Sequence, residues 1–243
     1  MSTTNERRRA PASRRSSGRD SNNVRGDATR EVILLTAERL FAERGIEAVP
    51  LRDIGVAAGQ RNHVAVQYHF GDRENLVQAI AAYRAQFLTE VSADLVADLV
   101  ADGRALTVTD FVRATITALA ANLDEESHFL PFISRYIIER GGYAGLEHTV
   151  PTGSATTLRT ILQRLLPDHT EALLDERWEI LFTSAVHTLA RYQVMMHDRA
   201  LTAPIDELIE DLVRVLAAGL ETPAVTSSRG PARGRGVGVV GPQ

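Results

Sequence analysis

The chain has 243 residues, of which 44% are hydrophobic and 24% charged, with a formal net charge of -4 and no cysteine. This length allows one large helical domain or two smaller ones with a real core. The lack of cysteine excludes disulfides and thiolate metal sites and fits a reducing compartment. We find no apolar run of about 18 residues and no apolar segment in the arginine-rich start, so neither a membrane span nor a secretory signal is predicted.

The charge is distributed unevenly along the chain. Residues 1–30 hold eight arginines against three acids, a balance of +5, and residues 222–243 hold three arginines and no acid. This leaves -12 for residues 31–221. A basic arm on an acidic body is typical of polyanion binders, but in a chain without lysine it can equally be a solvated tail. Residues 1–26 and 222–243 carry few large apolar groups, so we expect both to be disordered.

A first helix is predicted over residues 28–44, with Asp27 as its cap and Gly45 at its end. One apolar stripe has helical spacing and consists of Ile33, Ala37, Leu40 and Phe41. We expect the glutamates of this helix to face outward: Glu31, Glu38 and Glu43.

Residues 51–70 read as two short helices separated by a turn. The first helix has an apolar face at Leu51, Ile54 and Ala58, and Gly59 ends it because glycine accepts a positive φ. We expect the second helix to begin at about Asn62 and to carry polar side chains on its outer face. This is the geometry of a helix-turn-helix, whose second helix can enter a DNA major groove.

A long helix is predicted to follow, capped by Asp72 and closed by Gly103. Its apolar positions recur at helical spacing: Leu76, Ile80, Tyr83, Phe87, Val91, Leu95 and Leu99. A helix of this length can belong to both an N-terminal bundle and a C-terminal body and join them rigidly.

The remaining pattern is helical throughout. Thr107 and Asp110 form a capping box ahead of a helix that reaches about Leu123. A further helix is predicted from about Phe129 to Gly141, with Pro131 in its first turn, and a loop over 143–154 follows it. Three more helices are predicted over 158–165, from about Thr170 or Asp175 to His197, and over 204–220. The fold class is therefore all-α.

Residues 28–84 resemble the DNA-binding domain of TetR-type transcriptional regulators. The matching segments are residues 37–45 (Ala-Glu-Arg-Leu-Phe-Ala-Glu-Arg-Gly), 51–54 (Leu-Arg-Asp-Ile), 57–59 (Ala-Ala-Gly), 68–70 (Tyr-His-Phe) and 72–76 (Asp-Arg-Glu-Asn-Leu). The downstream chain matches the family by helical layout alone. The resemblance implies a helix-turn-helix domain over 27–84 and a helical ligand-binding and dimerisation domain over 85–221. The basic arm over 1–26 and the tail over 222–243 flank them.

The turn departs from the family pattern in two ways. Ten residues separate Gly59 from Phe70, one more than is common, and Gln60 stands where an aliphatic residue is usual. In addition, Leu51 replaces a common Thr or Ser, and Arg73 replaces a lysine, which keeps the cation but adds bidentate geometry. We expect a remodelled turn and a shifted register of the second helix on DNA.

The resemblance assigns DNA contacts to nine residues: Arg52, Arg61, Asn62, His63, Val66, Gln67, Tyr68, His69 and Arg73. Asn or Gln can pair bidentately with adenine, and Val can meet a thymine methyl. Arg52 and Arg73 are candidates for phosphate. Some of these side chains can instead cap or pack the small domain, His69 can equally cap a helix end, and Phe70 is expected in the core.

A ligand pocket is expected in the C-terminal half, as implied by the resemblance. Its candidate lining residues are Phe87, Phe111, Phe132, Tyr136, Trp178 and Phe182, each of which can instead be plain core. His187 is a candidate polar anchor, with a satisfied core or interface histidine as the alternative.

An enzyme is not predicted, because there is no cysteine nucleophile, no His-x-x-x-His metal pair and no phosphate-binding glycine loop before a helix. No metal or cofactor is expected. The sequence favours a cytoplasmic, nucleoid-associated repressor that binds a double-stranded DNA operator, dimerises through its last two helices and is released by a small apolar effector. The alternative is a helical interaction protein whose helix-turn-helix no longer reads DNA.

Overall fold

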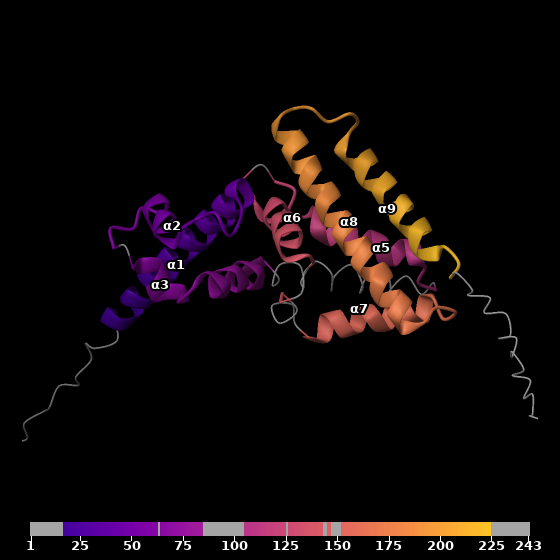
Figure 1. Cartoon of the computed structure of the whole chain (residues 1–243), viewed down its shortest axis with the longest axis horizontal. Coiled ribbons are helices and arrows are strands. Elements are labelled where there is room, and N and C mark those ends of the chain that lie inside the picture. The colour runs from indigo at the N-terminus through magenta and orange to yellow at the C-terminus, as the bar shows by residue number, and fades with distance from the viewer. Residues whose placement is uncertain are drawn as a thin grey trace, which may run out of the picture.

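The structure is a computed structural model that describes residues 17–62, 64–84, 105–124, 126–142, 145–146 and 152–224. Throughout these residues the regular structure is helical, as predicted. The N-terminal helices are α1 (Ser17–Arg44), α2 (Leu51–Ala57) and α3 (Ala65–Phe70), followed by a helical segment at 73–84. The C-terminal helices are α5 (Val108–Ala120), α6 (Phe129–Arg140), α7 (Thr152–Leu165), α8 (Glu171–His197) and α9 (Ile205–Glu221). Figure 1 shows these two groups side by side, with α6 where they meet.

Helix α1 begins at Ser17, eleven residues before the predicted start. The expectation that residues 17–26 are disordered is therefore wrong, and Asp27 lies inside the helix rather than at its cap. The reason is cooperativity: once the packed part of α1 has formed, each added turn requires no new nucleus, so even polar residues can extend it. The rest of the predicted arm lies outside the described residues.

The predicted apolar stripe of α1 is confirmed, since Ile33, Ala37 and Phe41 are fully buried and Leu40 nearly so. Glu38, however, does not face outward, because its residue is 1% exposed. It accepts two hydrogen bonds from Arg84, of 2.9 and 2.8 Å, and one of 3.2 Å from the backbone N–H of His128. Periodicity could not place it, because both partners are far away in the sequence.

Capping explains where several helices begin. The Asp72 side chain accepts a 2.8 Å hydrogen bond from the Asn75 backbone, which confirms the predicted cap of the segment at 73–84. Thr107 and Asp110 form the predicted capping box of α5. Thr170 caps α8, and α9 follows Pro204.

The C-terminal helices pack on one another and on α1. Helix α6 lies between α1 and α8, and α5 packs against α8 and α9, which run beside each other (Figure 1). The Phe41 ring of α1 stacks on Phe132 of α6 with centroids 6.3 Å apart. One continuous buried cluster therefore spans both groups of helices.

Several predicted features fall wholly or partly outside the described residues. The long helix is described only as far as residue 84, and the predicted tail only over 222–224. The loop predicted over 143–154 is too long at its C-terminal end, because α7 already begins at Thr152. Among the described residues, no helix combines the length and apolar character that a membrane span requires.

Candidate nucleic-acid interface

The turn after α2 is a regular helix C-terminus. Gly59 has a φ of +68°, and its N–H donates to the Val56 carbonyl over 3.0 Å. The N–H of Gln60 donates to the Gly55 carbonyl over 2.9 Å. These two bonds are the pair that defines a Schellman motif, so the turn closes in a standard way despite its extra residue.

Gln60 has a local structural role. A Schellman motif usually has an apolar contact between the residue after the glycine and the last turn of the helix. Here the facing residue, Gly55, has no side chain to offer, and the Gln60 amide instead donates to the Ala58 carbonyl over 3.0 Å. The polar residue at this position thus holds the turn by a hydrogen bond.

Helix α3 begins at Ala65, three residues later than predicted. Asn62 lies before it, where its side-chain oxygen accepts a 3.1 Å hydrogen bond from the Val64 N–H. Asparagine favours such local turns over helix, which explains the delayed start. His63 lies outside the described residues.

The predicted thymine contact of Val66 is wrong. Val66 is 1% exposed and belongs to the core. Its Cγ2 atom lies 3.5 Å from the place where a Cβ on Gly55 would stand, so α2 and α3 meet closely at this pair. Phe70 is 7% exposed, which confirms its predicted place in the core.

The outer face of α3 presents a mixed set of side chains. Tyr68 is 83% exposed and Val64 is 52% exposed, and Gln67 is also exposed. Positions 64, 67 and 68 are spaced by three and four residues and therefore share one helix face. Arg61 and Asn62 are exposed just before it. Val64 was missed at the sequence level, although its spacing from Gln67 and Tyr68 places it on this face.

The flanking cations differ in how they are engaged. The Arg52 side chain is 79% exposed and contacts only its neighbour Asp53, at 3.2 Å, among the contacts within the described residues. The Arg73 side chain is 27% exposed and donates to the Ile46 carbonyl over 2.7 Å and to Glu47 over 3.2 Å. Arg73 thus already holds the α1–α2 turn. His69 is half-buried, with its ring edge-to-face on Tyr68 at 5.2 Å.

The predicted pocket residues fall into different groups. Phe111, Trp178 and Phe182 form a chain of ring contacts, with 6.0 Å between the centroids of each consecutive pair. Phe132 instead stacks on Phe41, and Tyr136 is buried, with its hydroxyl beside Gly145. Phe87 lies outside the described residues. His187 Nδ1 lies 2.7 Å from the Ser134 hydroxyl, which fits the alternative of a satisfied histidine between helices.

The described part of the chain contains no group of three or more His, Asp or Glu residues that could hold a metal ion. Its distinctive surface is the α2–turn–α3 unit with an exposed polar and aromatic helix face. This unit is a helix-turn-helix on an all-helical body, the arrangement of a DNA-binding regulator.

Comparison with known proteins agrees with this class. Residues 33–80 match the family model of bacterial regulatory proteins of the tetR family. The HTH-type transcriptional repressor AcnR of Corynebacterium glutamicum is 39% identical over 66 residues, which are 27% of this chain and 35% of AcnR. The chain therefore matches about a third of the length of this curated relative. The N-terminal helices, over residues 33–80, are thus similar to the DNA-binding part of TetR-family regulators, as the sequence resemblance predicted.

A solved structure extends the likeness in fold to most of the chain. The crystal structure of "Probable transcriptional regulatory protein RHA5900" matches with a TM-score of 0.52 at 20% identity, covering 80% of this chain and all of that one. A TetR-family transcriptional regulator from Mesorhizobium loti matches with a TM-score of 0.47 at 14% identity, covering 81% and 96% of the two chains.

Proposed function

We propose that this protein binds an operator in double-stranded DNA through α2, the turn and α3, and represses transcription there. The observation that carries the proposal is the exposed face of Val64, Gln67 and Tyr68 on a helix held firmly by buried Val66 and Phe70. A glutamine amide can pair with adenine, and a valine can meet a thymine methyl. The repressor role is supported by the name of the relative AcnR.

Cationic and polar side chains of α2, the turn and α3 can add contacts to phosphate. Arg61 lies beside it and Arg52 lies at the start of α2, both exposed and able to meet phosphate, as can Asn62 and His69. We assign Arg73 a smaller share, because its guanidinium is already bound to the α1–α2 turn. The predicted roles of His63 rest on sequence alone.

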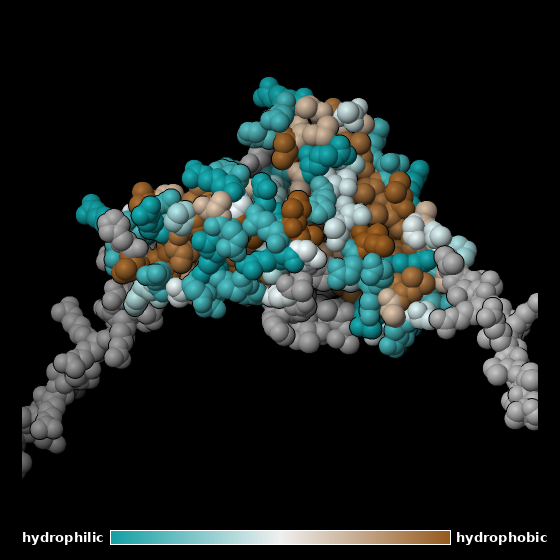
Figure 2. Space-filling view, in the orientation of Figure 1, coloured by the Kyte–Doolittle hydropathy of each residue, from teal (hydrophilic) through white to brown (hydrophobic). Residues whose placement is uncertain are grey.

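The protein acts as a homodimer in this proposal, joined through α8 and α9. Both helices expose large apolar side chains, with Ile180 at 56%, Val194 at 53% and Val215 at 60%. Figure 2 shows apolar side chains gathered along α8 and α9 on the face in view. A two-fold dimer through these helices would present two α3 helices to half-sites one DNA turn apart.

A small apolar effector would bind in the C-terminal domain, which we place at residues 85–221. The ring cluster of Phe111, Trp178 and Phe182 supports this, since Trp178 and Phe182 are only half-buried. The ligand can release DNA only by binding more tightly to a state whose two reading helices no longer fit the operator.

The alternative of a helical interaction protein rested on the unusual turn. That turn closes with the backbone hydrogen bonds of a Schellman motif and supports α3 as a formed helix. The structure therefore gives this alternative no specific support, and the regulator is the function we adopt.

A gel-shift with DNA from upstream of the protein's own gene tests the proposal. We expect binding that weakens steeply with salt, because phosphate contacts release counterions. Gln67→Ala should weaken binding to the operator by about 1–3 kcal/mol and leave binding to random DNA nearly unchanged. Gln163→Ala, an exposed glutamine on α7, is the matched control. Absence of any shift at low salt, from a folded dimer, would contradict the proposal.

The ligand is tested through Trp178, the sole tryptophan of the chain. Apolar compounds that release the operator should also change Trp178 emission in a saturable way. Release without a change in emission would place the effector outside the ring cluster.

A further inference from the structure

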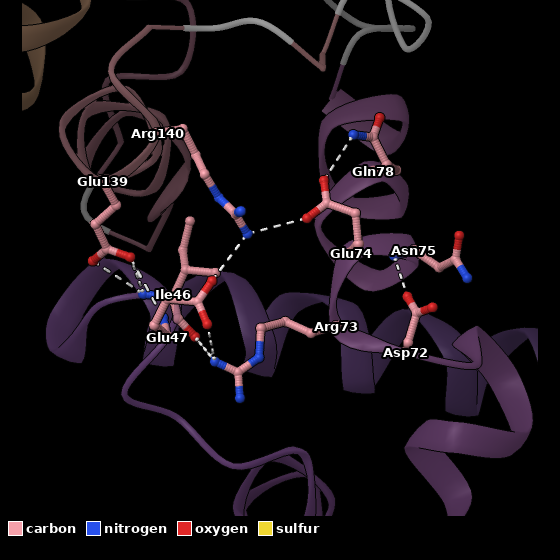
Figure 3. A network of polar contacts seen from close by, with 9 residues as sticks. All are labelled: Ile46, Glu47, Asp72, Arg73, Glu74, Asn75, Gln78, Glu139 and Arg140. Carbon is pink, nitrogen blue, oxygen red and sulfur yellow. Dashed lines mark hydrogen bonds and ion pairs between the residues drawn. The ribbon is translucent and has the colours of Figure 1, made fainter.

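A network of polar contacts joins the two groups of helices at the C-terminal end of α6 (Figure 3). There the Glu139 carboxylate accepts hydrogen bonds from the backbone N–H of Ile46, at 3.2 and 3.0 Å, and of Glu47, at 3.4 Å. The Glu139 side chain is 23% exposed, and Arg135 lies 4.0 Å from it on the same helix. A carboxylate of the C-terminal body is thus bound by the backbone of the turn that precedes α2.

The turn is shaped to receive this carboxylate. Gly45 ends α1 with a φ of +93°, and the two following N–H groups point together toward Glu139. Consecutive backbone N–H groups arranged in this way form an anion-binding nest. A Cβ on Gly45 would stand 2.6 Å from Glu139 Oε1, so glycine provides both the conformation and the space.

A second residue of α6 holds the same turn. Arg140 donates to Glu47 over 3.0 Å and to Glu74 over 3.1 Å, which ties the turn to the segment at 73–84. Arg73 reaches the turn from the other side, through the Ile46 carbonyl and Glu47. Figure 3 shows Glu47 between the two arginines. Charged partners from both groups of helices therefore fix one short segment.

The position of this segment decides where the reading helix points. Only residues 48–50 separate it from Leu51, the first residue of α2, and Pro50 restricts the last of these. Helix α2 in turn holds α3 through the close Gly55–Val66 contact. A rotation of α6 would thus be passed to α3 through a short connection.

We propose that Glu139 and Arg140 are positioning residues for DNA recognition. They fix the orientation of the helix-turn-helix on the C-terminal body, and so set the half-site spacing that a dimer accepts. This inference rests on the proposed function as a dimeric DNA-binding regulator. Glu38, bonded to Arg84 and to the backbone of His128, is a separate attachment that keeps the domains together when Glu139 is changed.

The first test measures orientation without DNA. Because the chain has no cysteine, nitroxide labels can be placed by Val56→Cys on α2 and Gln163→Cys on α7, both exposed positions. Labelled chains diluted with unlabelled protein report the distance within one chain by pulsed electron spin resonance. Glu139→Gln, which keeps the shape but loses the charge, should broaden the distance distribution and add other distances. Glu43→Gln, which changes an exposed glutamate paired with Arg39, is the matched control and should leave the distribution narrow.

The second test measures half-site spacing. The wild-type protein first selects a duplex from a random library, and that duplex is then lengthened or shortened between its half-sites. One base pair moves a half-site by about 3.4 Å and rotates it by about 35°. We expect the wild type and Glu43→Gln to lose about tenfold or more in affinity per added base pair, and Glu139→Gln to lose about threefold or less. Arg140→Gln should give an intermediate loss.

The outcomes distinguish the positioning role of Glu139 and Arg140 from the proposed function in DNA binding. Unchanged distance distributions and unchanged spacing profiles for a folded Glu139→Gln variant would overturn the positioning role. A wild-type protein that selects no sequence would overturn the proposed function, while the distance measurement would still decide the role of Glu139. Should Glu139→Gln fail to fold, the same two measurements on Arg140→Gln decide, since this side chain is 36% exposed and can be changed without opening the core.

Discussion

Two surfaces of the N-terminal helices use their polar side chains in opposite ways. Around the contact with α6, Glu38, Glu47 and the Arg73 that holds the same turn are each bound by partners far away in the sequence. On the outer face of α3, Gln67 and Tyr68 extend into solvent, and Val64 lies exposed with them. A DNA-binding domain needs both kinds of surface. A fixed contact with the C-terminal body sets the orientation of α3, and an exposed helix face keeps its side chains available to bases.

Substitutions at the contact with the C-terminal body should have the largest effect on stability. Glu38→Ala leaves Arg84 without its bidentate partner next to the core, and we expect a loss of about 3 kcal/mol in the free energy of unfolding. Burial lowers the pKa of Arg84, while the hydrogen bond and charge of Glu38 raise it overall. When Glu38 is removed, the guanidinium stays charged because the ordinary pKa of arginine lies far above neutral pH, and it is left without its partner. Urea denaturation measures the loss.

Glu43→Ala is the control for this experiment. It removes a glutamate from the same helix whose side chain is 42% exposed, so we expect a change within about 0.5 kcal/mol. Equal losses for the two variants would show that the buried pair has no special role.

Substitutions on the outer face of α3 should change operator binding but not stability. Tyr68→Ala should leave the free energy of unfolding within about 0.5 kcal/mol of the wild type, because the side chain is 83% exposed. The same change should weaken operator binding by about 1–3 kcal/mol. Paired denaturation and anisotropy measurements check both numbers. A large loss of stability with unaltered binding would assign Tyr68 to the structure of the domain instead.

Two valines in one helical turn sharpen the comparison. Val66→Ala removes two buried methyl groups and should lower the free energy of unfolding by about 2 kcal/mol. Val64→Ala should have little effect on stability, since it is 52% exposed, and should reduce operator affinity by about 1 kcal/mol through a lost methyl contact. If Val66→Ala proves the milder change for stability, then Val64 rather than Val66 faces the core and the register of α3 is wrong.

The smallest effect is expected far from both surfaces, at Glu210 on α9. The hydrogen bonds and charges of Arg113 and Arg214 lower the pKa of Glu210 from 4.5 to about 2. A lowered pKa stabilises the fold above the ordinary value, and this contribution is lost as the pH falls toward about 2. The unfolding free energy of the wild type should fall slightly more than that of Glu210→Gln over this range. Parallel pH profiles would show that the exposed pair contributes nothing.

The sequence predicts what depends on neighbours along the chain. The apolar stripe of α1, the Asp72 cap and the capping box of Thr107 and Asp110 all involve residues within a few positions of one another, and all are confirmed. The place of Phe70 in the core was predicted as well. These features follow from helical periodicity and local hydrogen bonding.

The sequence does not predict contacts between residues that lie far apart along the chain. Glu38 binds Arg84, which is 46 positions away, and the backbone of His128, which is 90 positions away. Glu139 binds the turn at Ile46, which lies 93 positions before it. Val64 and Val66 differ in exposure because α3 packs on α2 through Val66, close to Gly55, which leaves Val64 on the outer side. Asparagine at position 62 predicts a local turn as well as a base contact, and its hydrogen bond with the Val64 N–H shows the turn.

The central claim is that the face of Arg61, Val64, Gln67 and Tyr68 reads DNA. Selection of bound sequences from a random library by the full chain tests it most directly, with the wild type and Gln67→Ala run in parallel. We predict that the wild type enriches a roughly palindromic site with half-sites one DNA turn apart, and that Gln67→Ala relaxes the choice of base at one symmetric pair of positions. No enrichment by a folded wild-type dimer, or an identical site from both proteins, would contradict this claim.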